Sequence, residues 1–182
     1  MFGLFGTKNP YEQPARQLYA SAFNHTRMPC FYQEYAVPDT LDGRFDLLLL
    51  HLFLIINRMQ GEGRKGAQLG QAMFDVAFAD VDQGLRENGI GDMGLPKHMR
   101  RMMLAFNGRM HSYAEAVESS ELDKTLARNL YGTLENPRAD VLSRMSAYVT
   151  ETMAWLGKQQ SERIFEGQIE FIEPQEAKKY GT

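Results

Sequence analysis

The chain has 182 residues, of which 43% are apolar and 24% charged, which is the composition of an ordinary globular domain with its own core. Its net charge of −3 argues against a protein that binds polyanions over its whole surface, and we expect no nucleic-acid partner. The one cysteine, Cys30, excludes an intramolecular disulfide and a zinc site built from several thiolates. This cysteine usage fits a reducing compartment such as the cytoplasm.

The first ten residues, MFGLFGTKNP, show no targeting signal. They lack the basic region and the long apolar region of a secretory signal, and they are not the Arg-rich amphipathic segment of a transit peptide. The most apolar run, Leu47 to Ile56, has ten residues and is interrupted only by His51. Since a membrane span needs about 20 residues, this run predicts a buried helix instead.

Apolar residues repeat at steps of three and four along most of the chain, and this spacing predicts helices. The first covers about 10–25 and is followed by an irregular, aromatic stretch at 28–38. The second covers about 40–59, is apolar on nearly every side, and therefore belongs at the centre of the fold. The third covers about 64–88, after a turn at Gly61-Glu62-Gly63, and we expect Gly89 to end it.

Start signals divide the second half of the chain. A fourth helix begins near Leu95 and Pro96. Ser120, followed by acidic residues, predicts the N-terminal cap of a short fifth helix. Asn136-Pro137 predicts the start of a sixth, which ends near Gly157. Residues 169–172 predict an extended tail. We therefore expect one all-α domain over 1–182, with about six helices.

Short motifs between residues 45 and 117 resemble the core of the ubiquinol–cytochrome c chaperone family. In chain order these motifs are LHLF at 50–53, FD at 74–75, FAD at 78–80, LRE at 85–87, GD at 91–92 and PK at 96–97. The resemblance is to the shorter, proteobacterial form of the family. It implies a non-enzymatic protein that binds newly made cytochrome b and aids assembly of the respiratory cytochrome bc complex. Such a protein needs no cofactor of its own. It would be located in the cytoplasm, in peripheral contact with the inner membrane.

No catalytic or metal-binding motif accompanies this resemblance. The histidines, His25, His51, His98 and His111, do not form a Glu-x-x-His or a His-Glu-x-x-His motif. Cys30 stands outside any nucleophile motif, and no Cys-x-x-Cys-His is present for haem attachment. Two alternatives stay open: a helical protein that binds haem, quinone or lipid in its core, and an enzyme of unknown type.

Two polar residues fall on apolar helix faces. His51 lies within the most apolar run, and Asp80 lies opposite the polar stripe of the third helix. Because a buried polar group is costly without a partner, we expect them to pair with each other, or Asp80 to pair with Arg100 or Arg101. Such a pair would set the helix register, or it would mark a gap where the client, the protein bound by the chaperone, makes contact.

Basic residues and methionines are concentrated between residues 93 and 114, a stretch without an acidic residue. Methionine side chains adapt to varied apolar partners, and a local basic charge suits anionic headgroups or the polar ends of a client. A solvated helix face and ordinary core filling are the structural alternatives. The predicted client-binding residues are Met93, Lys97, Met99, Arg100, Arg101, Met103 and Arg109.

Overall fold

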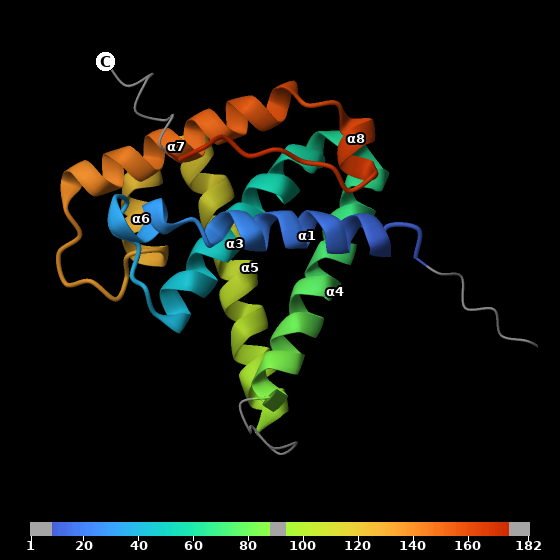
Figure 1. The fold of residues 1–182 in the computed structure, drawn as a ribbon, viewed down its shortest axis with the longest axis horizontal. Helices are drawn as coiled ribbons and strands as arrows, with labels where there is room; N and C mark the ends of the chain where they lie inside the picture. Colours follow the sequence, from blue (N-terminus) through green and yellow to red (C-terminus); the bar gives the residue numbers. More distant parts are fainter. Residues whose placement is uncertain (1–8, 88–93, 175–182) are drawn as a thin grey trace, which may run out of the picture.

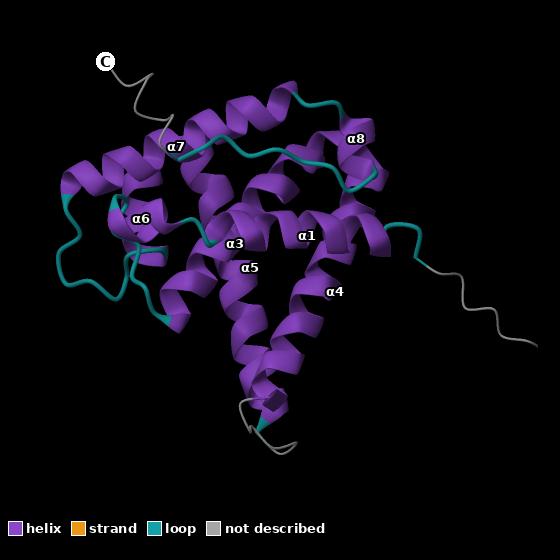
Figure 2. Cartoon of the chain, in the orientation of Figure 1, coloured by secondary structure: helices purple, strands orange, loops and turns teal. Residues whose placement is uncertain are grey.

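The computed structural model describes residues 9–87 and 94–174. Within these ranges every regular element is a helix, so the expected all-α class is confirmed (Figures 1 and 2). The helices are α1 (Glu12–Thr26), α2 (Pro29–Gln33), α3 (Leu41–Met59), η1 (Gln60–Glu62), α4 (Gly63–Glu87), α5 (Leu95–Ser119), α6 (Leu122–Asn129), α7 (Ala139–Lys158) and α8 (Ser161–Phe165).

Helix α3 is the centre of the fold, as its apolar character predicts. It contacts α1, α4, α5 and α7. Thr40 begins it by accepting a hydrogen bond from the Gly43 backbone N–H at 3.1 Å. Every residue from Leu47 to Ile55 is buried. No helix in the described ranges is long and apolar enough to cross a membrane.

The helices α4 and α5 form a long hairpin that extends away from the rest of the molecule (Figure 1). Helix α1 crosses the base of this hairpin and packs on both α3 and α4. Helix α7 lies on the other side of α3, next to α6. The segment after α8 has no regular secondary structure and runs beside α7, as expected for residues 169–172 (Figure 2).

Two apolar clusters make up the core, and α3 belongs to both. Leu47, Leu50, Phe53 and Leu54 pack with α5, α6 and α7. Leu48, Leu49, Leu52 and Ile55 pack with α1, α4 and the same α5. A helix that is apolar all round therefore joins the two halves of the molecule.

Some expected boundaries are wrong. The stretch 28–38 contains the short helix α2. Ser120 does not cap α6: it ends α5 in the left-handed conformation with φ 59°, and α6 begins at Leu122 with no side-chain cap. Helix α7 begins at Ala139, after Asn136-Pro137. The expected stop at Gly89 lies outside the described residues.

Candidate functional site

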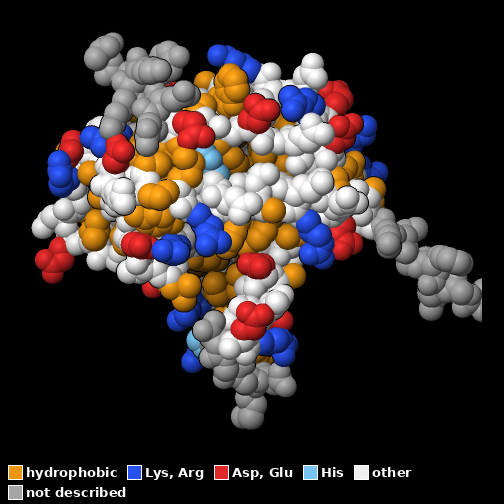
Figure 3. Space-filling view, viewed as in Figure 1, with side chains coloured by type: hydrophobic (Ala, Val, Ile, Leu, Met, Phe, Trp, Pro, Cys, Tyr) orange, Lys and Arg blue, Asp and Glu red, His pale blue; other side chains and the backbone are white. Residues whose placement is uncertain are grey.

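An open cleft of about 970 Å³ lies where α1, α3, α4 and α5 meet. In the space-filling view, apolar side chains gather in a hollow between the middle of α1 and the α4–α5 hairpin, and Lys and Arg side chains lie at its edge (Figure 3). Smaller contributions come from the end of α6 and the turn at Gly132 and Thr133. We call this feature the apolar cleft.

The floor of the apolar cleft is built from one side of each of three helices. The lining positions recur at steps of three and four, so they lie along one face of their helix. The main apolar ones are Leu48, Leu49 and Leu52 on α3, Phe78, Val81 and Leu85 on α4, and Met102 and Phe106 on α5. Val81, Leu85 and Met102 are half-buried, so apolar surface stays accessible inside the cleft.

Aromatic packing fixes the width of the hairpin beside the cleft. The Phe78 ring packs on Phe74 with centroids 4.3 Å apart. Phe106 of α5 meets both rings edge-on, at 5.7 Å from Phe78 and 5.2 Å from Phe74. Edge-to-face contacts of this kind stabilise a pair beyond the area that it buries. The floor is thus supported by a three-ring cluster within the hairpin.

Arginines outnumber carboxylates around the cleft. The arginines are Arg27, Arg44, Arg101, Arg109 and Arg128, and the carboxylates are Asp42, Asp46 and Asp80. The chain as a whole has a net charge of −3, so the positive charge here is local.

One ion pair lies deep in the lining. Arg109 Nη2 is 2.6 Å from Asp46 Oδ1, and both side chains are mostly buried. Burial raises the pKa of Asp46 to about 6, although the Arg109 guanidinium acts in the opposite direction. Asp46 thus stays within reach of protonation under mildly acidic conditions.

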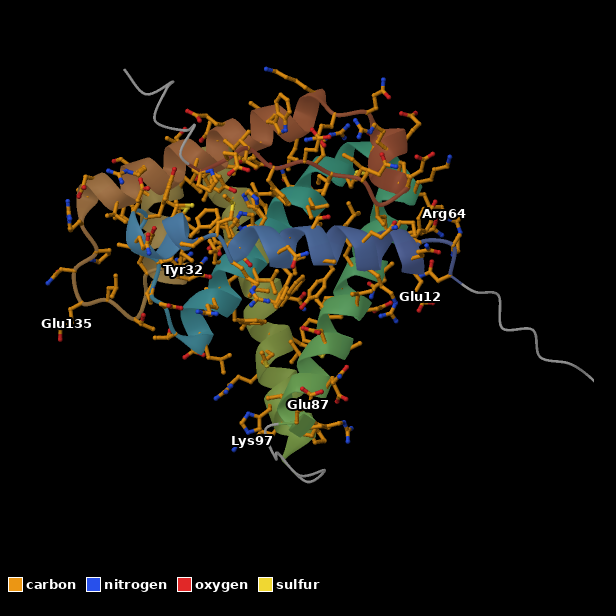
Figure 4. The ribbon with its side chains drawn as sticks, in the orientation of Figure 1. Glu12, Tyr32, Arg64, Glu87, Lys97 and Glu135 are labelled. Atoms are coloured by element: carbon orange, nitrogen blue, oxygen red, sulfur yellow. The ribbon has the colours of Figure 1, made fainter. Side chains whose placement is uncertain are left out.

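The structure places only part of the predicted client-binding set in the cleft. Arg101 and Arg109 line it. Lys97, Met99, Arg100 and Met103 do not, although they belong to the same helix. Lys97 lies toward the outer end of the hairpin, near Glu87 (Figure 4). Met99 packs against the core, whereas Met103 is 39% exposed. Met93 lies outside the described residues.

The expected pairing of His51 with Asp80 is wrong. His51 is fully buried, and its Nε2 lies 2.8 Å from the Tyr148 hydroxyl, which is also 3.0 Å from His25 Nε2. Asp80 is exposed and accepts a hydrogen bond from the Tyr19 hydroxyl at 2.7 Å. The two side chains do not meet because they point in different directions. His51 points from α3 toward α7, whereas Asp80 on α4 faces α1. Neither Arg100 nor Arg101 forms an ion pair with Asp80 in the described ranges.

An apolar groove beside the basic stretch is what a chaperone of this family would need, but the sequence did not predict where it lies, and the reason is geometric. Val81 and Leu85 belong to an apolar helix face, and such a face predicts burial in the core. They line an open hollow because the hairpin extends beyond the helices that would cover that face. Tyr148 likewise lies on an apolar face of its helix. A hydroxyl in such a position signals a polar partner, and this signal was present in the sequence.

Metal chemistry has little support among the described residues. No group of three or more His, Cys, Asp or Glu side chains there is arranged to hold a metal ion. Cys30 is buried, and burial raises the pKa of its thiol, so it is a poor nucleophile.

Fold and cleft together define an all-α protein with an open apolar cleft that is lined at several points by arginine. The family model described as "Ubiquinol-cytochrome C chaperone" matches residues 33–171, and the chain belongs to that family. This confirms the resemblance seen in the short motifs. A solved structure described as the Cbp3 homolog from Brucella abortus is 33% identical, with a TM-score of 0.79, and the match covers 91% of this chain and 92% of that one.

Curated relatives carry consistent names. The chain is 28% identical to a mouse protein named ubiquinol-cytochrome c reductase complex assembly factor 1, over 82% of this chain and 51% of the relative. It is 31% identical to the Xenopus laevis protein of that name, over 60% and 54%. Protein CBP3, mitochondrial, of Saccharomyces cerevisiae is 23% identical, over 79% and 44%. The chain thus spans about half the length of these curated relatives.

Proposed function

We propose that this protein is a non-enzymatic assembly chaperone that binds newly made cytochrome b and aids biogenesis of the respiratory cytochrome bc complex. Family membership and the names of the relatives support the assembly role. The observation that carries the binding role is the open apolar cleft. A chaperone for a membrane protein must cover apolar segments temporarily, and this surface is suited to that task.

The dimensions of the cleft suit a helix. Its lining on α3 runs from Leu41 to Leu52, which at 1.5 Å per residue corresponds to about 16 Å. At 5.4 Å per turn, this length corresponds to about three turns of a client helix. A client helix would bury its apolar face there and leave the other face outside.

We place the protein in the cytoplasm, in peripheral contact with the inner membrane where such a client is inserted. This localisation supports the function because the client segment would pass directly from chaperone to membrane. Fractionation of cells making the tagged chain tests it: the protein should divide between the membrane and soluble fractions, and high salt should release the membrane-bound part. A protein found wholly in the soluble fraction at low salt would contradict the peripheral contact.

The function is tested by affinity purification of the tagged protein from cells that are synthesising cytochrome b. Cytochrome b should be recovered with the wild-type chain. Leu85→Glu, which places a carboxylate in the half-buried cleft lining, should reduce that recovery severalfold. The matched control is Leu104→Glu, the same substitution at a position on α5 that is 65% exposed and outside the lining.

Circular dichroism should first show that both variants are folded. Equal loss in both variants would move the client site away from the cleft. Absence of cytochrome b from the wild-type sample, under conditions where it is made, would contradict the proposed function itself.

A further inference from the structure

Three arginines at the mouth of the apolar cleft have no carboxylate partner among the described residues. Arg27, Arg101 and Arg128 are exposed, and no ion pair involves any of them within residues 9–87 and 94–174. Arg27 lies just after the end of α1 and faces the Phe23 ring at 5.7 Å. The other two belong to α5 and α6.

Most carboxylates of the lining are already engaged. Asp46 is paired with Arg109, and Asp80 accepts the Tyr19 hydroxyl. A fourth arginine, Arg44, is bound to Asp39 at 2.6 Å. Asp42 is the one carboxylate in the lining for which the described ranges show no such partner. The hydrogen bond from the neutral Tyr19 hydroxyl leaves the charge of Asp80 in place, but five arginines face three carboxylates in the lining, so the net charge there is positive.

The three arginines come from three separate segments of the chain, the end of α1, α5 and α6, so they do not follow one helix face. Figure 3 shows basic side chains at the edge of the apolar hollow. A guanidinium presents donors that match a carboxylate in a bidentate arrangement, and it stays charged at any pH of interest. A segment with an apolar face and carboxylates beside that face would pack on the apolar floor and form ion pairs with the three arginines.

We propose that the segment received by the cleft is an apolar helix with carboxylate side chains beside its apolar face, and that Arg27, Arg101 and Arg128 bind those carboxylates. This inference rests on the proposed function only in that the cleft receives a protein segment. It adds a basis for specificity. The apolar floor would bind apolar helices in general, whereas the three arginines would favour helices that carry carboxylates and disfavour helices that carry basic side chains.

The test uses three synthetic helical peptides of about 14 residues that share one apolar face and span slightly more than the lining length. The residues beside that face are all Glu, all Gln or all Lys. Binding to the full chain is measured by fluorescence anisotropy at about 50 mM and about 500 mM salt. One exposed ion pair contributes about twofold to fivefold in affinity, so two or three should make the Glu peptide about tenfold tighter than the Gln peptide. The Lys peptide should bind most weakly, and high salt should remove most of the difference.

Protein variants assign the effect to the arginines at the mouth. Arg27→Gln combined with Arg101→Gln should weaken binding of the Glu peptide about fivefold and leave the Gln peptide unaffected. The control is Arg138→Gln, which removes an exposed arginine from the loop before α7, outside the cleft.

The outcomes separate this inference from the proposed function. Equal binding of the Glu and Gln peptides at low salt overturns the carboxylate selection and leaves the client role standing. If Arg138→Gln weakens binding of the Glu peptide as much as the double variant does, the carboxylate selection is also overturned. Failure of all peptides to bind, with tight binding of an anionic fatty-acid probe instead, overturns the inference and removes the cleft from the proposed function.

Discussion

The Tyr148 hydroxyl joins two histidines in a hydrogen-bond chain with a defined direction. His51 Nδ1 lies 2.9 Å from the Leu47 carbonyl, which can only accept, so Nδ1 carries the proton. The neutral His51 ring must then accept from Tyr148 through Nε2. The hydroxyl has a single proton, so His25 donates to it through Nε2. This chain links α1, α3 and α7, and the Phe171 ring covers it by stacking on His25 at 4.8 Å.

Removing the Tyr148 hydroxyl should destabilise the protein. Tyr148→Phe leaves His51 Nε2 without a donor in a site that is 0% exposed. An unsatisfied buried acceptor costs about 1–3 kcal/mol, and this loss should appear in urea denaturation. The control, Tyr11→Phe, removes a hydroxyl from a half-buried residue for which the described residues show no side-chain hydrogen bond, and it should change stability by less than about 0.5 kcal/mol. Equal effects in the two variants would show that the hydrogen-bond chain contributes nothing.

The buried histidines also predict how stability depends on pH. Burial lowers the pKa of His25 to about 4 and that of His51 to about 3. Below about pH 6.5 the unfolded chain takes up these protons and the folded chain does not, so stability should fall as the pH drops from 6.5 to 4. His25→Gln should flatten the slope of unfolding free energy against pH in this window, by up to about 1.4 kcal/mol per pH unit.

Asp46 should have the opposite effect on the pH dependence of stability within part of the same pH range. Because its pKa is raised from 3.8 to about 6, the folded chain holds a proton there that the unfolded chain has lost, so acidification through pH 6 is stabilising. Asp46→Asn should therefore steepen the decline seen in the wild type. Denaturation curves for the three proteins between pH 4 and 7 check both signs, and a steeper slope in His25→Gln would refute the assignment of its pKa.

At the scale of the helices, the connection from α3 to α4 depends on close backbone approach. The chain passes through η1 and enters α4 at Gly63, whose φ is +57°, a conformation that favours glycine. A Cβ on Gly66 would lie 2.0 Å from the Met59 carbonyl oxygen. The turn signal at Gly61-Glu62-Gly63 was visible in the sequence, but the need for glycine at position 66 was not, since it arises from the contact across the turn.

Two glycines one turn apart in α4 should respond oppositely to alanine. Gly66→Ala forces the backbone apart and should cost about 1–3 kcal/mol. Gly70→Ala meets only the Ile56 side chain at 3.8 Å, an ordinary contact, and should stabilise the helix by about 0.5–1 kcal/mol. Thermal unfolding of the two variants against the wild type measures both values. A stabilised Gly66→Ala would mean that the turn relaxes at no cost.

At the scale of the whole molecule, the shared helix α3 makes the fold one cooperative unit. Both apolar clusters depend on it, so neither has a complete core without the other. The single tryptophan, Trp155, is 40% exposed and belongs to α7, whose buried apolar residues are part of the first cluster. We therefore expect its fluorescence to report on that half of the molecule. Far-UV circular dichroism follows all helices.

A truncation in the second cluster should therefore change the unfolding transition that Trp155 on α7 reports. Leu49→Ala, at a side chain that is 1% exposed, should cost about 2–5 kcal/mol and shift the tryptophan and circular dichroism transitions by the same amount. Leu134→Ala, in an exposed loop, should shift neither by more than about 0.5 kcal/mol. Separate midpoints in Leu49→Ala would show that the two clusters unfold independently.

The sequence by itself determined the helical class, the central helix, the family and the need of His51 for a polar partner. These follow from local spacing and composition, because periodicity, turn residues and short motifs act over a few residues. Tertiary structure alone decided that Tyr148 is the partner of His51, that Asp80 is exposed beside Tyr19, and that Val81 and Leu85 line a cleft. An apolar helix face has the same sequence pattern whether another helix covers it or not. Which faces stay open depends on how far the α4–α5 hairpin extends past its neighbours, and that is set by packing between segments far apart in the chain.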